Sequence, residues 1–278
     1  MIYYLLKIYL KLKMLTYKRI IESTEIIIYI EEQLYNYMPN IFNSIFCTFE
    51  LCNNNICNPN TIHIYSQKDI FEEYKYPCFC NTRNPMWIFI LINMLENYLY
   101  ELLNCTVLHG SCVRVNKKNV LIIGERKSGK STLTQYLINN CSAEYMSDDS
   151  VFIKDEVYYG FAFPILMRKI VKKIKHIGTT RDEENIKRYI YSPVNILPQG
   201  NNIDLILFPK YDKYTNFQNN KLKNRYLFNS LIKNVKFSKD MRTIYKDISN
   251  LTNISESYQV CYNQCGNVAS FIDKINNP

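Results

Sequence analysis

Residues 120–132 combine the residue types and the spacing of a phosphate-binding loop, or P-loop. They fit the pattern G-x-x-x-x-G-K-[ST], with Gly124, Gly129, Lys130 and Ser131 at the fixed positions. In such a loop, backbone N–H groups surround a phosphate, and the N-terminus of the following helix adds the positive end of its dipole. Because an apolar stretch precedes the loop and an amphipathic helical pattern follows it, the segment predicts binding of a nucleoside triphosphate, with ATP as the expected ligand.

The individual positions of this loop have expected roles. Lys130 can reach the β- and γ-phosphates, and the hydroxyl of Ser131 can bind Mg²⁺. Gly129 lets the backbone approach the phosphates where a Cβ atom would collide. We expect nucleotide contacts from the whole loop and the start of the helix: Gly124, Glu125, Arg126, Lys127, Ser128, Gly129, Lys130, Ser131 and Thr132.

Two adjacent carboxylates, Asp148 and Asp149, follow Lys130 by one helix and one strand. In a parallel or mixed sheet, a strand at this distance in sequence from the phosphate loop is expected to end beside the loop. One carboxylate could then hold Mg²⁺ together with Ser131, while the other accepts a proton from an attacking hydroxyl. Two like charges this close would raise the pKa of one of them, which suits a general base. A solvated turn or a helix N-cap is the alternative, since Ser-Asp-Asp-Ser is also good capping chemistry.

Three segments together resemble a known family. The Leu-His-Gly sequence at 108–110, the loop at 124–131 and the Ser-Asp-Asp sequence at 147–149 are similar to the catalytic domain of bacterial HPr kinase/phosphorylase. The resemblance is closer still to the HPr-kinase-like kinases found beside peptide-biosynthesis genes, including those that phosphorylate lasso precursor peptides. It implies a phosphate-binding core like that of phosphoenolpyruvate carboxykinase.

The resemblance also implies roles for individual residues. Lys130 and Ser131 would hold phosphate and metal. Asp148 and Asp149 would divide the roles of base and metal ligand, and His109 would lie beside the reacting hydroxyl. Without the resemblance, a lone histidine is more often structural than catalytic.

By position alone, Arg168 is a candidate to neutralise phosphate charge, and it could equally be the first residue of a basic surface helix. The basic stretch 168–176 could hold an acidic peptide or form the solvated face of that helix. The Glu-x-Arg-Gly-x-Gly signature of HPr kinases is absent after Asp149, which argues against HPr as the acceptor.

Composition narrows the class of protein without identifying a partner. The chain has 278 residues and a formal net charge of +9, which favours anionic ligands. It has no helix-turn-helix, zinc-finger or RNA-binding pattern, so we expect no nucleic-acid partner. Its 10 cysteines lack the spacing of common zinc sites and suit a reducing compartment. The apolar start, residues 1–15, is a strand-like entry too short and too rich in lysine to cross a bilayer, so we expect a cytoplasmic protein without a membrane partner.

Hydrophobic patterning predicts an α/β protein of two domains. Residues 1–83 alternate as strands and predict a small β-rich or mixed N-terminal domain, while residues 84–278 predict the kinase-like domain with a mixed sheet. An Asn-Pro pair marks the boundary ahead of a helix predicted over 86–103. A hairpin is predicted over 105–123, leading into the phosphate loop, and the polar residues 177–202 predict a loop.

Together these observations predict an ATP- and Mg²⁺-dependent kinase. It would transfer the γ-phosphoryl group to a hydroxyl, with serine expected, on a peptide, a protein or a small molecule. The alternative is a regulatory module that senses the nucleotide without transferring phosphate. The two differ at Asp148, Asp149 and His109, because a sensor needs no base beside an acceptor. The sequence leaves open whether the protein forms a homo-oligomer.

Overall fold

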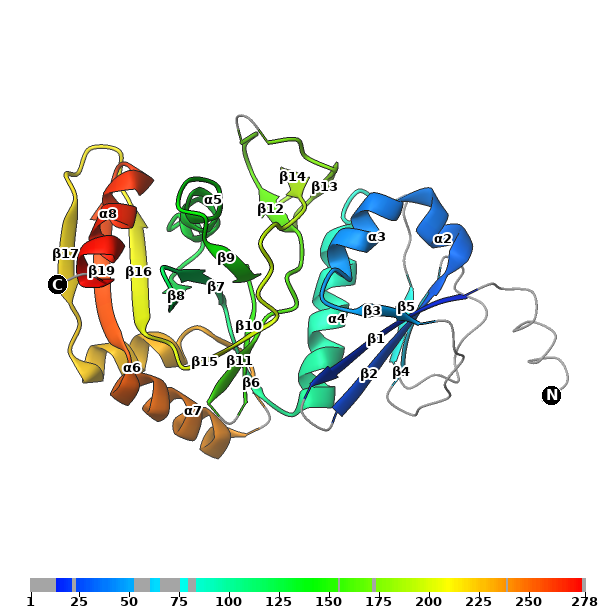
Figure 1. Cartoon of the computed structure of the whole chain (residues 1–278), viewed down its shortest axis with the longest axis horizontal. Coiled ribbons are helices and arrows are strands. Elements are labelled where there is room, and N and C mark those ends of the chain that lie inside the picture. Colours follow the sequence, from blue (N-terminus) through cyan, green and yellow to red (C-terminus); the bar gives the residue numbers. More distant parts are fainter. Residues whose placement is uncertain are drawn as a thin grey trace, which may run out of the picture. The chain divides into compact units, whose positions relative to one another are not determined.

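The chain is a mixed α/β protein with several sheets (Figure 1). The predicted strand entry at residues 1–13 lies outside the described residues. Contacts within the chain form two compact units: unit 1 comprises Met1–Leu102 and Arg168–Tyr191, and unit 2 comprises Leu103–Met167 and Ser192–Pro278. The computed structural model describes residues 14–21, 24–52, 61–65, 76–79, 84–154, 156–171, 174–238 and 240–276.

Unit 1 is built on a five-stranded sheet in the order β3-β1-β2-β4-β5. β1 pairs antiparallel with β2 and β3, whereas β2 with β4 and β4 with β5 run parallel. The strands are β1 (Met14–Ile21), β2 (Thr24–Glu31), β3 (Glu50–Cys52), β4 (Thr61–Tyr65) and β5 (Tyr76–Phe79). The β-branched run of β2 is buried from Ile26 to Ile30 and forms the centre of this sheet.

The described part of unit 1 also contains three helices and a hairpin: α2 (Glu32–Tyr37), α3 (Pro39–Ile45), α4 (Trp87–Leu103), β13 (Gly178–Arg181) and β14 (Lys187–Tyr191). The helix predicted over 86–103 is confirmed as α4. It belongs with this unit because Trp87 at its start packs against Phe42 of α3, with ring centroids 6.1 Å apart. The contacts therefore divide the chain after Leu102, whereas the sequence places the boundary before residue 84.

The segment 168–202 differs from its predicted structure. Residues 178–191 contain an antiparallel hairpin where the polar sequence predicts a loop. The hairpin has little apolar alternation to signal it, because most side chains of β13 and β14 are exposed or half-buried. The described residues of the basic stretch 168–176 form no helix, so the predicted helical face is wrong there.

Unit 2 contains the phosphate loop and a six-stranded sheet in the order β17-β19-β16-β8-β7-β9. β8 runs parallel to β16 and antiparallel to its hairpin partner β7. The hairpin predicted before the loop is thus confirmed. Its turn residues, Asn116 and Lys117, both have positive φ, as a two-residue hairpin turn requires. The strands are β7 (Gly110–Val115), β8 (Lys118–Ile123), β9 (Glu144–Ser147), β16 (Leu205–Tyr211), β17 (Gln218–Lys221) and β19 (Glu256–Tyr262).

A second, antiparallel sheet of unit 2 has the order β15-β11-β10-β6-β18. Its strands are β6 (Thr106–Leu108), β10 (Val151–Lys154), β11 (Val157–Tyr159), β15 (Gln199–Asn201) and β18 (Val235–Phe237); the short strand β12 (Ile165–Met167) also lies in unit 2. The helices are α5 (Lys130–Asn140), α6 (Asn224–Ile232), α7 (Met241–Ile254) and α8 (Cys265–Asn276). The core joins Leu121 and Ile123 of β8 to Val151 of β10, Leu231 of α6 and Leu251 of α7.

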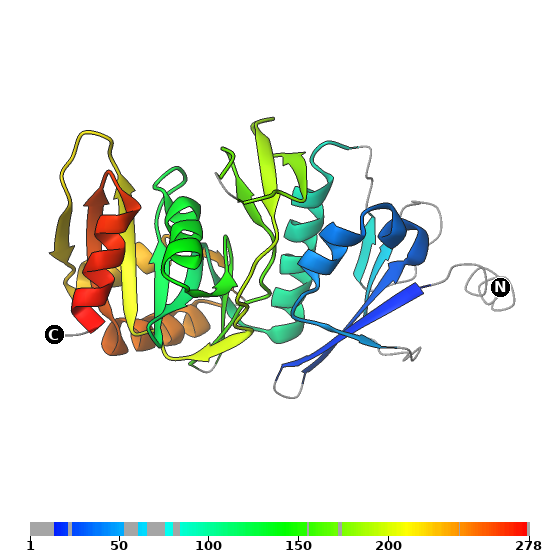
Figure 2. The same ribbon diagram turned by 45° about the horizontal axis from the view of Figure 1, so that its top comes forward.

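The helices of unit 2 fall into two pairs. α5 and α8 lie side by side (Figure 2), and α5 packs on β7 and β8. α6 and α7 pack against each other and contribute to the core described above. Within the described ranges, no helix has both the length and the apolar character of a membrane span.

Candidate active site

The phosphate loop connects the end of β8 to the start of α5, as the sequence predicts. Gly129 has a φ of 101°, and a Cβ there would collide with the hydroxyl of Tyr262, so both the backbone and the space favour glycine. The same hydroxyl donates to the Gly129 carbonyl at 3.3 Å. In the described chain no side chain caps the N-terminus of α5. Its first N–H groups are therefore oriented to receive an anion.

Lys130 folds back onto the loop that precedes it. Its ammonium donates to the carbonyl of Gly124 at 2.6 Å and to that of Glu125 at 3.1 Å, and the residue is 8% exposed. Burial lowers the pKa of Lys130, and the carboxylates of Asp148 and Asp149 oppose that shift. The ammonium is thus desolvated against neutral carbonyls, and a phosphate in their place would form a stronger, charge-assisted bond.

His109 and the acidic pair meet because the chain crosses twice between the two sheets of unit 2. His109 connects β6 to β7, and residues 148–150 connect β9 to β10. β7 pairs with β9 in one sheet, and β6 pairs with β10 in the other. The two crossings therefore lie next to each other, and the side chains at both crossings share one site.

Asp148 is the buried member of the acidic pair. The hydroxyl of Ser111 donates to its carboxylate. Burial raises the pKa of Asp148, and hydrogen bonds from Ser111 and Ser131, together with the charge of Lys130, oppose that rise. Ser131, at the start of α5, therefore lies close enough to Asp148 to favour its ionised form.

Asp149 is half-exposed and lies between two basic groups. Its carboxylate is 3.1 Å from Nδ1 of His109 and 3.4 Å from Nζ of Lys236. Desolvation raises the pKa of Asp149, but the hydrogen bond from His109 and the charge of Lys236 outweigh it and hold the pKa below its usual range. The adjacent carboxylates therefore differ, since Asp148 is more easily protonated and Asp149 stays charged.

The other predicted residues of the loop lie around the helix N-terminus. Glu125, Arg126, Lys127 and Thr132 are exposed and open to a ligand. Ser128 is half-buried, and its carbonyl accepts the backbone N–H of the residue at the end of β16 at 3.0 Å. The loop thus presents its charged side chains to solvent while its backbone is held by neighbouring strands.

Arg168 lies in unit 1. Its guanidinium is 3.3 Å from the carboxylate of Glu184 and 3.8 Å from that of Asp182. Asp182 also pairs with Arg188. These carboxylates already neutralise Arg168, and its contact with phosphate stays a prediction.

Three residues of the site are missing from the sequence prediction: Ser111, Lys236 and Tyr262. Ser111 lies two positions after His109, and this proximity is the one local signal that could have found it. Lys236 lies in the three-residue strand β18, and its Nζ also donates to the Ser150 hydroxyl at 3.0 Å. Lys236 and Tyr262 reach the site through sheet pairings that no local pattern indicates.

The donor groups fit a nucleotide phosphate and a hard cation. The uncapped helix N-terminus and Lys130 suit phosphate oxygens. The hydroxyl of Ser131 and the carboxylates of Asp148 and Asp149 are oxygen donors of the kind that Mg²⁺ prefers. In the described part of the chain, no cluster of three or more His, Cys, Asp or Glu side chains is placed to bind a metal.

Comparisons with known proteins give structural likenesses without a sequence match. No family model matches the chain, and no curated protein matches it. Among solved structures, the Hpr(Ser) kinase/phosphatase from Coxiella burnetii is similar at 13% sequence identity and a TM-score of 0.25, covering 57% of this chain and 79% of that chain. A TM-score this low does not establish a common fold.

Proposed function

We propose that unit 2 is a kinase with a P-loop core, which binds ATP with Mg²⁺ and transfers the γ-phosphoryl group to a hydroxyl. The observation that supports this proposal is the register of β7, which pairs Gly110 with Ile123 and Cys112 with Ser147. This register brings the start of the phosphate loop and the acidic pair to the same end of the sheet. A nucleotide sensor needs the loop alone. The acidic pair and His109 add groups that suit an acceptor beside the phosphates.

The residues divide into those that bind the donor and those that face the acceptor. Lys130 and the N-terminus of α5 bind the β- and γ-phosphates, and Ser131 and Asp148 would hold Mg²⁺, which neutralises phosphate charge when bound. Asp149, supported by His109, orients the acceptor hydroxyl. As the new O–P bond forms, the hydroxyl proton passes to Asp149. The bond from the γ-phosphorus to the bridging oxygen breaks, and ADP leaves.

The lowered pKa of Asp149 is compatible with this role. Phosphoryl transfer passes through a loose transition state with little bonding to the acceptor, so the position of the base matters more than its basicity. Asp149 is half-exposed, whereas Asp148 is buried and already accepts from Ser111. The greater exposure of Asp149 supports our proposal that Asp149 faces the acceptor.

For the acceptor, we propose a serine hydroxyl on a peptide, a protein or a small molecule. The net charge of +9 suits an acidic acceptor. The sequence resemblance adds precursor peptides encoded nearby as the first candidates to try. We further propose that the protein works in the cytoplasm, without a nucleic-acid or membrane partner.

The test is incubation with γ-labelled ATP and Mg²⁺, alone and with free serine, HPr and peptides encoded nearby, read by intact mass. We expect a gain of one phosphoryl group on one acceptor. Asp148→Asn and Asp149→Asn should each abolish transfer and leave ATP affinity within a small factor. Glu144→Gln, a half-exposed carboxylate on β9, is the matched control and should retain activity. Tight ATP binding without transfer to any acceptor would contradict the kinase and support the sensor.

A further inference from the structure

An exposed tyrosine stands beside the phosphate loop. Tyr211 is 52% exposed and is the last residue of β16, the strand that runs parallel to β8. Its Cβ lies 3.3 Å from the position that a Cβ on Gly129 would occupy. Tyr211 and the loop thus lie at the same carboxyl edge of the sheet, where open α/β sheets bind their ligands.

The structure holds Tyr211 in place although much of it faces solvent. Its backbone N–H donates to the Ser128 carbonyl at 3.0 Å, and the next N–H, of Asp212, donates to the Tyr262 carbonyl at 2.9 Å. The ring packs edge-on against Tyr262, with centroids 5.8 Å apart and planes at 72°. Tyr262 in turn donates to the Gly129 carbonyl. Tyr211 is therefore a pre-positioned aromatic surface coupled to the loop.

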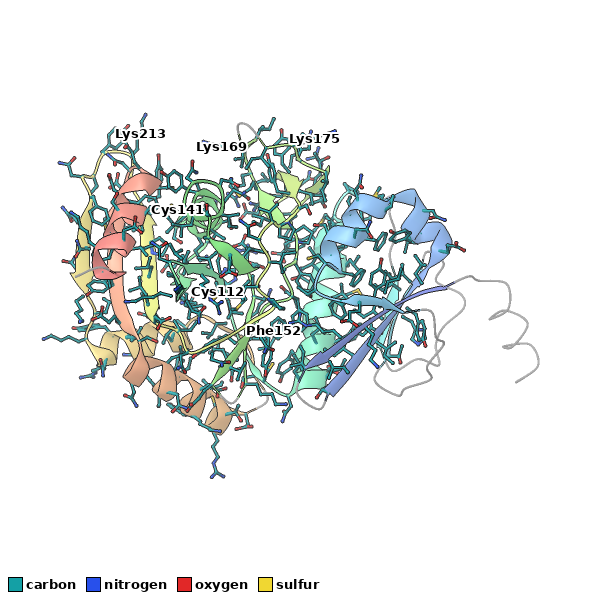
Figure 3. All side chains as sticks on the ribbon, in the orientation of Figure 1. Cys112, Cys141, Phe152, Lys169, Lys175 and Lys213 are labelled. Carbon is teal, nitrogen blue, oxygen red and sulfur yellow. The ribbon has the colours of Figure 1, made fainter. Side chains whose placement is uncertain are left out.

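A second exposed tyrosine in the same connection shows what distinguishes Tyr211. Tyr214 is 90% exposed. Its ring lies under the ammonium of Lys213 at 5.6 Å. Figure 3 labels Lys213 on the connection between β16 and β17. Its backbone N–H is held by Asp212, within the connection itself. A single exposed tyrosine of this kind needs no explanation, whereas Tyr211 is held by the phosphate loop and its neighbours.

We propose that Tyr211 is the stacking surface for the base of the nucleotide, and that the site consequently selects a nucleoside triphosphate over an inorganic polyphosphate. This inference rests on the proposed binding of phosphates by the loop. Aromatic side chains stack on bases with little preference among them, because every base has a π-face. We expect the site to prefer ligands that carry a base and to discriminate only weakly between purines.

The test is calorimetric titration of the full chain with ATP and with inorganic tripolyphosphate, at fixed Mg²⁺. Wild type should bind ATP more tightly than tripolyphosphate. Tyr211→Ala should weaken ATP binding about tenfold or more and leave tripolyphosphate binding within about twofold. Tyr211→Phe should keep the affinity for ATP, because the ring remains. Tyr214→Ala is the matched control and should change neither ligand.

The outcomes separate this inference from the proposed function. If wild type binds tripolyphosphate as tightly as ATP, the loop binds phosphates and the stacking surface is refuted. Equal weakening of both ligands by Tyr211→Ala would show that the residue only shapes the loop, and it would refute stacking too. If wild type binds neither ligand, both proposals are wrong. A thermal melt of Tyr211→Ala that matches wild type excludes misfolding as the cause of a loss.

Discussion

The phosphate loop and the connection at residues 148–150, which carries the acidic pair, meet at one site but are built in different ways. The loop, residues 124–129, is recognisable from its own residue types and backbone geometry, with a positive φ at Gly129. The crossing around Asp149 depends on charged side chains from separate strands, including Lys236 of β18. The comparison teaches that a local spacing in the sequence can indicate a candidate phosphate site, whereas the pKa values of the neighbouring carboxylates depend on distant parts of the chain.

The largest effect is expected at the loop itself. Lys130→Met removes the buried ammonium that Gly124 and Glu125 hold in place. We expect phosphoryl transfer to fall about 10³-fold, because a fixed charge at the phosphates is lost in a site sheltered from water. Lys274→Met, which removes an exposed lysine of α8 outside the loop, is the control and should retain most activity. Equal losses in both variants, measured as kcat/KM, would show that the protein attracts ATP only by net charge.

Gly129→Ala tests the backbone side of the comparison. The new Cβ would meet the Tyr262 hydroxyl and force alanine into a positive φ, so we expect the free energy of unfolding to fall by about 2 kcal/mol. ATP affinity should fall about 100-fold, because the helix N-terminus shifts. Gly266→Ala, whose Cβ would lie 3.1 Å from the Tyr136 hydroxyl, is the control and should change ATP affinity little. Urea unfolding and calorimetry measure the two quantities, and an unchanged affinity in Gly129→Ala would refute the role of this geometry.

Lys236→Met tests the charged side of the comparison. We expect phosphoryl transfer to fall about tenfold at neutral pH, because Asp149 loses one of the two groups that orient it. In the wild-type protein the pKa of Asp149 is lowered. Its ionised form therefore stabilises the folded protein at pH values above the usual pKa of a carboxyl group, and this contribution is lost as the pH falls through the pKa of Asp149 in the folded state. Removing Lys236 raises the pKa of Asp149 in the folded protein. On acidification, the variant should therefore begin to lose stability and activity at a higher pH than wild type.

A matched control separates this shift from a general change in charge. Lys233→Met removes an exposed lysine at the end of α6, three residues earlier. Its pH profiles of kcat and of thermal stability should match those of wild type. An acid limb at the same pH in Lys236→Met and wild type would show that Lys236 does not set the charge of Asp149.

The smallest effect is expected at Arg168. Its pairs with Glu184 and Asp182 already neutralise it, so Arg168→Ala should weaken ATP binding by less than about threefold. The loss of stability should stay below about 1 kcal/mol, since the guanidinium is one-third exposed. A tenfold loss of ATP affinity with unchanged stability would instead support the predicted contact between Arg168 and phosphate.

The sequence predicted those parts of the fold and site that local patterns encode. The hairpin before the loop, the strand-loop-helix unit and the helix α4 all follow from apolar spacing and turn residues. The hairpin at 178–191 escaped prediction because its strands are mostly polar. Lys236 escaped because β18 has three residues and pairs with a strand more than a hundred positions earlier. The pKa values of Asp148 and Asp149 shift in opposite directions because of burial and of charges from distant residues. Neither cause can be recognised from two adjacent aspartates in the sequence.

The same separation in sequence has a consequence for folding. In unit 2, β18 pairs with β6, β16 inserts beside β8, and the hydroxyl of Thr106 donates to Asp247 across 141 positions. Pairings between such distant segments form slowly, because long loops must close first. A ribosome that has synthesised the chain through α5 has made the whole phosphate loop but none of β18. The site is therefore completed only after β18 has emerged and docked, and a nascent chain would hold an incomplete site until then.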